Sequence, residues 1–334
     1  MKKVQILDST LRDGGYRNNW LFGANKISGI FRGLIDANID IIETGLLNEY
    51  TKDNENSSVY SCIEQYEKRF NNIDTQKSKV VLMLKYGTYS IDKFKQKKSR
   101  IIDGIRVYFR QSELAEVVKY CHQIKEELGY DVYLNPVNIF GYNDKELEYL
   151  IEKVNQLKPY SLAIVDTFGI MQIKDLQRYF DLFDKKLNEK INLGLHVHNS
   201  LELSFANSIA FTEFDTKRNL IIDSSLLGIG KGCGICQTEL IINYLKSKFS
   251  YDYKIEAIEK TILTQLNQET VELSTEEKLL YRISALNRCH PDYAFYLRKV
   301  LNLSFAEIQK KLSFLDTNKK FNFDERYFQF ANSI

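Results

Sequence analysis

Eight short β-rich runs recur through the first two thirds of the chain, and their regular spacing constrains the fold more than any other feature. Successive runs begin about 30 residues apart, which is the length of one strand, one helix and two loops. The runs lie at residues 4–7, 39–42, 79–84, 104–109, 131–134, 161–165, 192–197 and 219–222.

Segments with a helical period separate these runs. One apolar stripe comprises Ile27, Ile30, Phe31, Leu34 and Ile35, and similar stripes follow within 114–128 and 147–157. Strict alternation of strands and helices requires parallel strands joined by crossovers. The succession predicts an α/β fold of the (β/α)8 TIM-barrel type over residues 1–248, with a doubly wound open sheet as the alternative.

The strand signal fades after about residue 250. Helical patterns follow at 254–268, 275–287, 293–301 and 304–313, and no Gly/Ser-rich linker separates them from the first part. We therefore expect residues 249–334 to form a C-terminal helical extension that docks rigidly on the barrel.

Charge and composition exclude several classes of protein. The net charge is +2, which predicts no broad electrostatic field for steering nucleic acid. We find no apolar run of about 20 residues that would span a membrane, and no secretory signal at the start. Five cysteines without paired spacings are typical of a reduced compartment. We expect a cytoplasmic protein with neither nucleic acid nor membrane as a partner.

Polar residues gather where the predicted strands end, which is where a barrel of this type carries its active site. His196 and His198 form an H-x-H pair, and residues i and i+2 of a strand point to the same side. Asp13, after the first strand, would complete a set of two imidazoles and one carboxylate around a metal ion. The alternative is two imidazoles that only form hydrogen bonds at a strand end.

The segment at 8–14 (DSTLRDG), taken with His196-Val197-His198, resembles the signature of the DRE-TIM metallolyase superfamily. Further fragments fit the layout of that family in the same order, namely IETG at 42–45, VDTFG at 165–169 and DSSLLGIGKG at 223–232. The likeness runs from residue 1 to about residue 245 and is greatest to aldolase-type members such as 4-hydroxy-2-oxovalerate aldolase. HMG-CoA lyases share the same barrel.

The resemblance implies a divalent metal, Mn2+ or Mg2+ with Zn2+ and Co2+ as alternatives, held by Asp13, His196 and His198. The metal would act as a Lewis acid on a 2-oxo acid. Arg12 would stabilise the enolate oxygen, unless it only forms a structural ion pair with Asp8 or Glu43. The remaining candidates for substrate contact are Glu43, Arg106, Asn138 and Thr167, with ion pairs at the barrel mouth as the alternative.

The sequence departs from the family pattern at two positions. Tyr16 stands where pyruvate-forming aldolases carry a histidine base, and Ile235 stands where many members carry a metal-binding Asn. His290, in the helical extension, is a substitute candidate because its reference pKa of about 6.5 suits proton transfer. The general base therefore stays open between Tyr16, His290 and a metal-bound water, and so does any role of Cys233 and Cys236.

These observations predict a carbon–carbon lyase that cleaves or forms a 4-hydroxy-2-oxo acid, with a small 2-oxo acid and an aldehyde as its partners. The alternatives are a Claisen-type acyl transferase that uses acetyl-CoA, an HMG-CoA lyase-like enzyme, and a non-catalytic barrel subunit. The resemblance also allows a homodimer and an aldehyde dehydrogenase partner.

Overall fold

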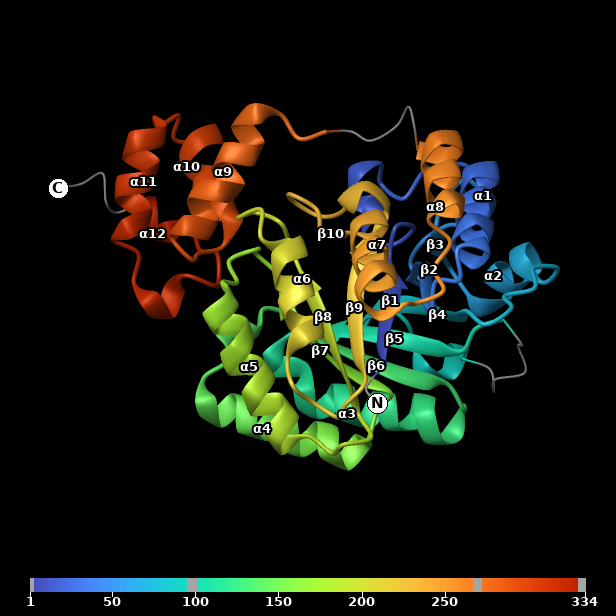
Figure 1. The fold of residues 1–334 in the computed structure, drawn as a ribbon. Coiled ribbons are helices and arrows are strands. Elements are labelled where there is room, and N and C mark those ends of the chain that lie inside the picture. Colours follow the sequence, from blue (N-terminus) through green and yellow to red (C-terminus); the bar gives the residue numbers. More distant parts are fainter. Residues whose placement is uncertain (1–2, 95–100, 267–271, 330–334) are drawn as a thin grey trace.

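Eight parallel strands close into a barrel in the computed structural model, which describes residues 3–94, 101–266 and 272–329. The ring order is β1-β2-β4-β5-β6-β7-β8-β9, and β9 pairs with β1 to close it (Figure 1). The strands are β1 (Val4–Asp8), β2 (Ile41–Leu47), β4 (Lys79–Lys85), β5 (Gly104–Phe109), β6 (Asp131–Pro136), β7 (Ser161–Asp166), β8 (Asn192–Val197) and β9 (Leu220–Ser225). The predicted barrel is confirmed, and each predicted run overlaps one of these strands.

Helices cover the outside of the barrel because their apolar stripes pack on the strands. They are α1 (Ala24–Asp36), α2 (Ile63–Phe70), α3 (Leu114–His122), α4 (Asp144–Leu157), α5 (Ile173–Lys186), α6 (Ser204–Glu213) and α7 (Thr238–Phe249). All five apolar residues of the α1 stripe are buried. Two short strands that the sequence did not predict, β3 (Val59–Tyr60) and β10 (Cys236–Gln237), pair with β2 and β9.

The interior of the barrel is filled in layers. An apolar layer of Leu7, Ile41, Val81, Tyr133 and Ile221 closes its lower part. The strands are buried on both faces, which explains why they read as continuous apolar runs rather than as alternating patterns. Charged side chains lie above this layer, toward the carboxyl ends of the strands, where a barrel places its chemistry.

The predicted C-terminal helices are confirmed. In the described residues they are α8 (Ile255–Thr261), α9 (Thr275–Leu286), α10 (Pro291–Lys299), α11 (Phe305–Ser313) and α12 (Arg326–Gln329), of which the sequence did not predict the last. Helix α8 packs beside α1, and its Ile258 belongs to the barrel core. Helices α9 to α12 form a group of their own (Figure 1). They share a second core that includes Leu280, Tyr293 and Leu297. The boundary at residue 248 stays a prediction, and the end of the helix predicted at 254–268 lies outside the described residues.

None of the helices that the structure describes is long and apolar enough to cross a membrane.

Candidate active site

Asp13, His196 and His198 converge at the carboxyl end of the barrel. Their side chains are buried, and one ligand atom from each lies within 4.8 Å of the other two. Asp13 follows β1, whereas the two histidines are at the end of β8 and point the same way along the strand. The structure thus brings together the three residues predicted from the H-x-H pair and the DSTLRDG segment.

Hydrogen bonds fix the imidazole rings from behind. His196 Nδ1 lies 2.9 Å from an Asp223 carboxylate oxygen, and His198 Nδ1 lies 2.9 Å from the backbone carbonyl of Asp166. In each ring Nδ1 therefore carries the proton and donates it to an oxygen, so the lone pair on Nε2 is available, as in metal-binding histidines. Burial and the neighbouring His196 lower the pKa of His198 to about 4, so this imidazole is neutral at pH 7 and able to bind a cation.

The donor atoms of this cluster fit a divalent metal. Within the described residues, Asp13 Oδ2 and His198 Nε2 are buried and have no hydrogen-bond partner. Burial alone would raise the pKa of Asp13, but Arg12 and then the two histidines lower it below its usual value. Two imidazoles and one ionised carboxylate form a facial set that leaves coordination positions open.

Gly230 allows the loop after β9 to pass directly beside this carboxylate. A Cβ atom at that position would lie 2.7 Å from Asp13 Oδ2. Ile235, in the same loop, forms a backbone bridge with His198 and is buried. Its alkyl side chain cannot bind a metal, so this loop shapes the site through its backbone.

Arg12 links the metal cluster to a buried network of charges. Its Nε donates to Glu43 Oε2 at 2.6 Å and its Nη1 to Asp13 Oδ1 at 2.8 Å. Arg106 is paired with Glu43 at 3.1 Å and with Asp223 at 2.5 Å. The ion pair between Arg12 and Glu43, one of the two structural pairs that the sequence allows, is therefore present. The other, between Arg12 and Asp8, does not form, because Asp8 accepts hydrogen bonds from the Thr238 hydroxyl and the Thr10 backbone N–H.

A cavity of about 840 Å3 opens above these charges. Of the residues expected to contact substrate, Arg12, Asn138 and Thr167 line it, whereas Glu43 and Arg106 do not. The structure places both beneath the cavity floor, because their side chains pair with each other inside the barrel. We therefore reassign them from substrate contact to positioning Arg12 and Asp223.

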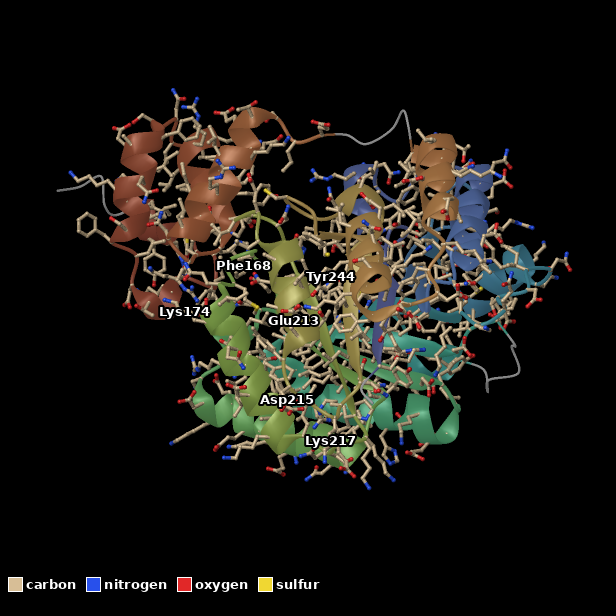
Figure 2. All side chains as sticks on the ribbon, viewed as in Figure 1. Phe168, Lys174, Glu213, Asp215, Lys217 and Tyr244 are labelled. Atoms are coloured by element: carbon tan, nitrogen blue, oxygen red, sulfur yellow. The ribbon has the colours of Figure 1, made fainter. Side chains whose placement is uncertain are left out.

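The helical extension supplies one wall of the cavity. His290 precedes α10 and its ring packs 4.7 Å from that of Phe168, which Figure 2 shows between the barrel and the C-terminal helices. Phe321, Asn322 and Phe323 line the same wall. Sequence reasoning missed these three, because nothing in their local pattern indicates which part of the barrel they meet.

The two candidate proton carriers differ in their surroundings. Burial, and then Tyr108, raises the pKa of Tyr16 to about 12, although 40% of the residue is exposed, so its phenol keeps its proton at neutral pH. Burial lowers the pKa of His290, whose Nδ1 accepts the backbone N–H of Asp292 at 3.2 Å. A neutral His290 therefore carries its proton on Nε2.

The two loop cysteines remain thiols. Burial raises the pKa of Cys233, and it raises that of Cys236 to about 12. Neither environment favours the thiolate that nucleophilic attack or metal binding needs.

Comparisons with known proteins find relatives of this chain in both sequence and structure. The sequence model of a family described as HMGL-like matches residues 3–268. The chain is 26% identical over 243 residues to a 4-hydroxy-2-oxovalerate aldolase of Geobacillus genomosp. 3, covering 72% of this chain and 70% of the relative. For the corresponding aldolase of Spirochaeta aurantia the identity is 25% over 252 residues, with 73% and 70% covered.

Solved structures share the fold. The N-terminal domain of a protein provisionally described as an aldolase, from Bacteroides vulgatus, superposes with a TM-score of 0.71 at 20% identity, covering 92% of this chain and 99% of that one. The HMG-CoA lyase of Bacillus subtilis gives a TM-score of 0.63 at 17% identity, with coverages of 78% and 92%.

Proposed function

Because the chain belongs to the HMGL-like (DRE-TIM) family, we propose that it is a metal-dependent aldolase that cleaves or forms the C–C bond of a 4-hydroxy-2-oxo acid. Its products in the cleavage direction are pyruvate, or a related 2-oxo acid, and an aldehyde. The observation that carries the proposal is the convergence of Asp13, His196 and His198 beside the Arg12 guanidinium.

The metal held by these three residues, Mn2+ or Mg2+, supplies Lewis-acid polarisation of the 2-oxo carbonyl when bound. Arg12 adds a permanent cation with N–H donors beside the same oxygen, where negative charge develops as the bond breaks. Its orientation is fixed, because Glu43 and Asp13 each accept one of its N–H groups. A prepositioned donor of this kind stabilises the transition state without reorganisation.

Proton transfer falls to the groups around the cavity. Tyr16 keeps its phenolic proton and His290 carries one at Nε2, so both suit donation to the aldehyde oxygen during addition. By microscopic reversibility, the group that donates in addition accepts the 4-hydroxyl proton in cleavage. Thr167, whose hydroxyl accepts the backbone N–H of Asn138 at 2.7 Å, retains its own proton for the substrate carboxylate.

The test is the exchange of the pyruvate methyl protons with deuterium, followed by NMR in D2O with Mg2+. The purified protein is expected to catalyse the exchange, and chelation of the metal is expected to abolish it reversibly. His198→Ala is expected to lose both metal and exchange, whereas His122→Ala, an exposed histidine on α3, keeps both. Lack of exchange with any small 2-oxo acid would contradict the proposed chemistry. Cytoplasmic location, a homodimer and a dehydrogenase partner stay predictions.

A further inference from the structure

The active-site cavity is larger than the smallest aldol substrates require. Its volume of about 840 Å3 lies in the upper part of the range of about 300–1,000 Å3 that holds ligands of drug size. A 2-oxo acid of three carbons at the metal end leaves most of this space for the aldehyde. What lines the remaining space therefore indicates the aldehyde that fits it.

Cationic side chains lie at two opposite sides of this cavity. Lys231 lies on the metal side, since its Nζ is 5.6 Å from the centre of the Tyr16 ring and its charge acts on Asp13. Lys85 ends β4, and Arg110 directly follows β5. In the ring order the metal ligands belong to the first and seventh strands, so β5, the fourth, stands across the mouth from them.

Lys85 and Arg110 have no anionic partner among the described residues. Lys85 is half-buried, so its charge is partly removed from water. Glu113 lines the same wall, and one of its carboxylate oxygens accepts the backbone N–H of Arg110 at 2.7 Å. Because Lys85 and Arg110 are cations and Glu113 is one anion, the net charge of this wall is positive.

Polar atoms without partners accompany the two cations. The Tyr142 hydroxyl and Asn138 Oδ1 belong to residues that line the cavity, and within the described residues neither forms a hydrogen bond. Buried polar atoms are seldom left unpaired in proteins, so each of these is a natural partner for a hydroxyl group of a ligand.

We infer that the aldehyde substrate carries an anionic group at the end remote from its carbonyl, and that Lys85 and Arg110 bind this group. The inference rests on the proposed function. The 2-oxo acid contributes one carboxylate, for which Thr167 and the Lys231 cation on the metal side suffice. The cations across the mouth therefore select a second anion. Phosphate and carboxylate share the chemistry that these side chains recognise.

The chemical step is a balanced aldol addition. The methyl carbon of the 2-oxo acid loses one proton and forms a bond to the aldehyde carbon. The C=O π pair of the aldehyde moves to its oxygen, which takes up one proton. No electrons are exchanged with any other compound.

Two matched pairs of aldehydes test the inference with pyruvate and the Mg2+-loaded full chain. D-erythrose 4-phosphate is compared with D-erythrose, and succinic semialdehyde with butanal. We expect kcat/KM to favour an anionic member at least tenfold, as befits charge-assisted hydrogen bonds. The larger ratio of the two pairs identifies phosphate or carboxylate as the group bound.

Variants assign the effect to the wall. Lys85→Gln and Arg110→Gln are each expected to reduce the anionic-to-neutral ratio about tenfold, whereas Lys85→Arg retains it. Lys174→Gln is the matched control, because this exposed lysine lies on α5 (Figure 2) and does not line the cavity. Equal ratios in the wild type and the two Gln variants would overturn the inference.

A binding measurement separates this inference from the proposed function. Calorimetric titration with erythrose 4-phosphate and with erythrose reports the preference without turnover, and we expect Lys85→Gln to abolish it. Deuterium exchange without an anionic preference refutes the inference and leaves the proposed aldolase intact. A preference for the anionic aldehyde in binding, without deuterium exchange, refutes the proposed aldolase and supports the anion site. If neither the preference nor the exchange is observed, the binding measurement refutes the anion site and the exchange measurement refutes the aldolase.

Discussion

Replacement of Asp223 by Asn tests how the buried charge network tunes the metal centre. The Asp223 carboxylate contacts His196 Nδ1 at 2.9 Å and Arg106 Nη2 at 2.5 Å. Burial would raise its pKa, but Arg106 and then His196 lower it to about 2, so the group is ionised at neutral pH. In Asp223→Asn the shape is kept and the charge behind the His196 ring is lost.

The magnitude follows from the position of Asp223 behind a metal ligand. Loss of such a partner typically weakens metal binding about 10- to 100-fold, which corresponds to about 1.4–2.8 kcal/mol. The fold should survive, because Arg106 stays paired with Glu43 at 3.1 Å. Arg12 and Arg106 then balance the two remaining carboxylates of the network, those of Asp13 and Glu43.

Calorimetric titration of the metal-free protein with Mn2+ at pH 7.5 measures the effect as a dissociation constant. Asp215→Asn is the control, since Asp215 is exposed on the far side of the barrel from the helical extension (Figure 2). A dissociation constant within twofold of the wild type, in a variant with an unchanged melting temperature, would refute the assignment of Asp223 as the residue that positions His196.

Three other changes have expected outcomes. In Arg12→Lys the ammonium group cannot keep the hydrogen bonds of Arg12 to both Glu43 and Asp13. We therefore expect kcat for aldol cleavage to fall about 100- to 1,000-fold at saturating metal, with a smaller change in KM. An unchanged kcat would exclude Arg12 as the group that stabilises the enolate. Burial raises the pKa of Asp8 from 3.8 to about 6, so this group disfavours folding increasingly as the pH rises from 4 to 6. Urea titrations should therefore show Asp8→Asn gaining up to about 3 kcal/mol relative to the wild type between pH 4 and 7, and a pH-independent difference would contradict the cause given. Gly45 has a φ of +148°, and a Cβ atom at this position would lie 2.0 Å from the Ser58 carbonyl oxygen. Gly45→Ala should therefore lower the free energy of unfolding by about 3 kcal/mol. Gly87→Ala should lower it by only about 1 kcal/mol, because a Cβ atom at Gly87 meets no other atom within 4 Å. Similar melting temperatures for the two glycine variants would contradict this steric account.

The metal ligands were predictable because the features that identify them are local. His196 and His198 are two residues apart on one strand, and strand geometry alone points them to the same side. Arg12 and Asp13 lie in one short segment after β1, at the barrel end where chemistry gathers. Asp223 directly follows the predicted strand at 219–222, but its partner His196 is on the neighbouring strand, and only the register of the sheet brings the two side chains together.

Local patterns in the sequence are sufficient to predict the barrel, because buried strands and amphipathic helices recur along the chain with a regular period. Only the three-dimensional contacts show that Glu43 and Arg106 pair beneath the cavity floor. The same holds for the packing of Phe321 on Phe168 and of Phe323 on His290, and for the place of Lys85 and Arg110 on the cavity wall across from the metal ligands. These relations join residues far apart in sequence. They depend on closure of the ring and on docking of the helices, and neither leaves a periodic signal in the chain.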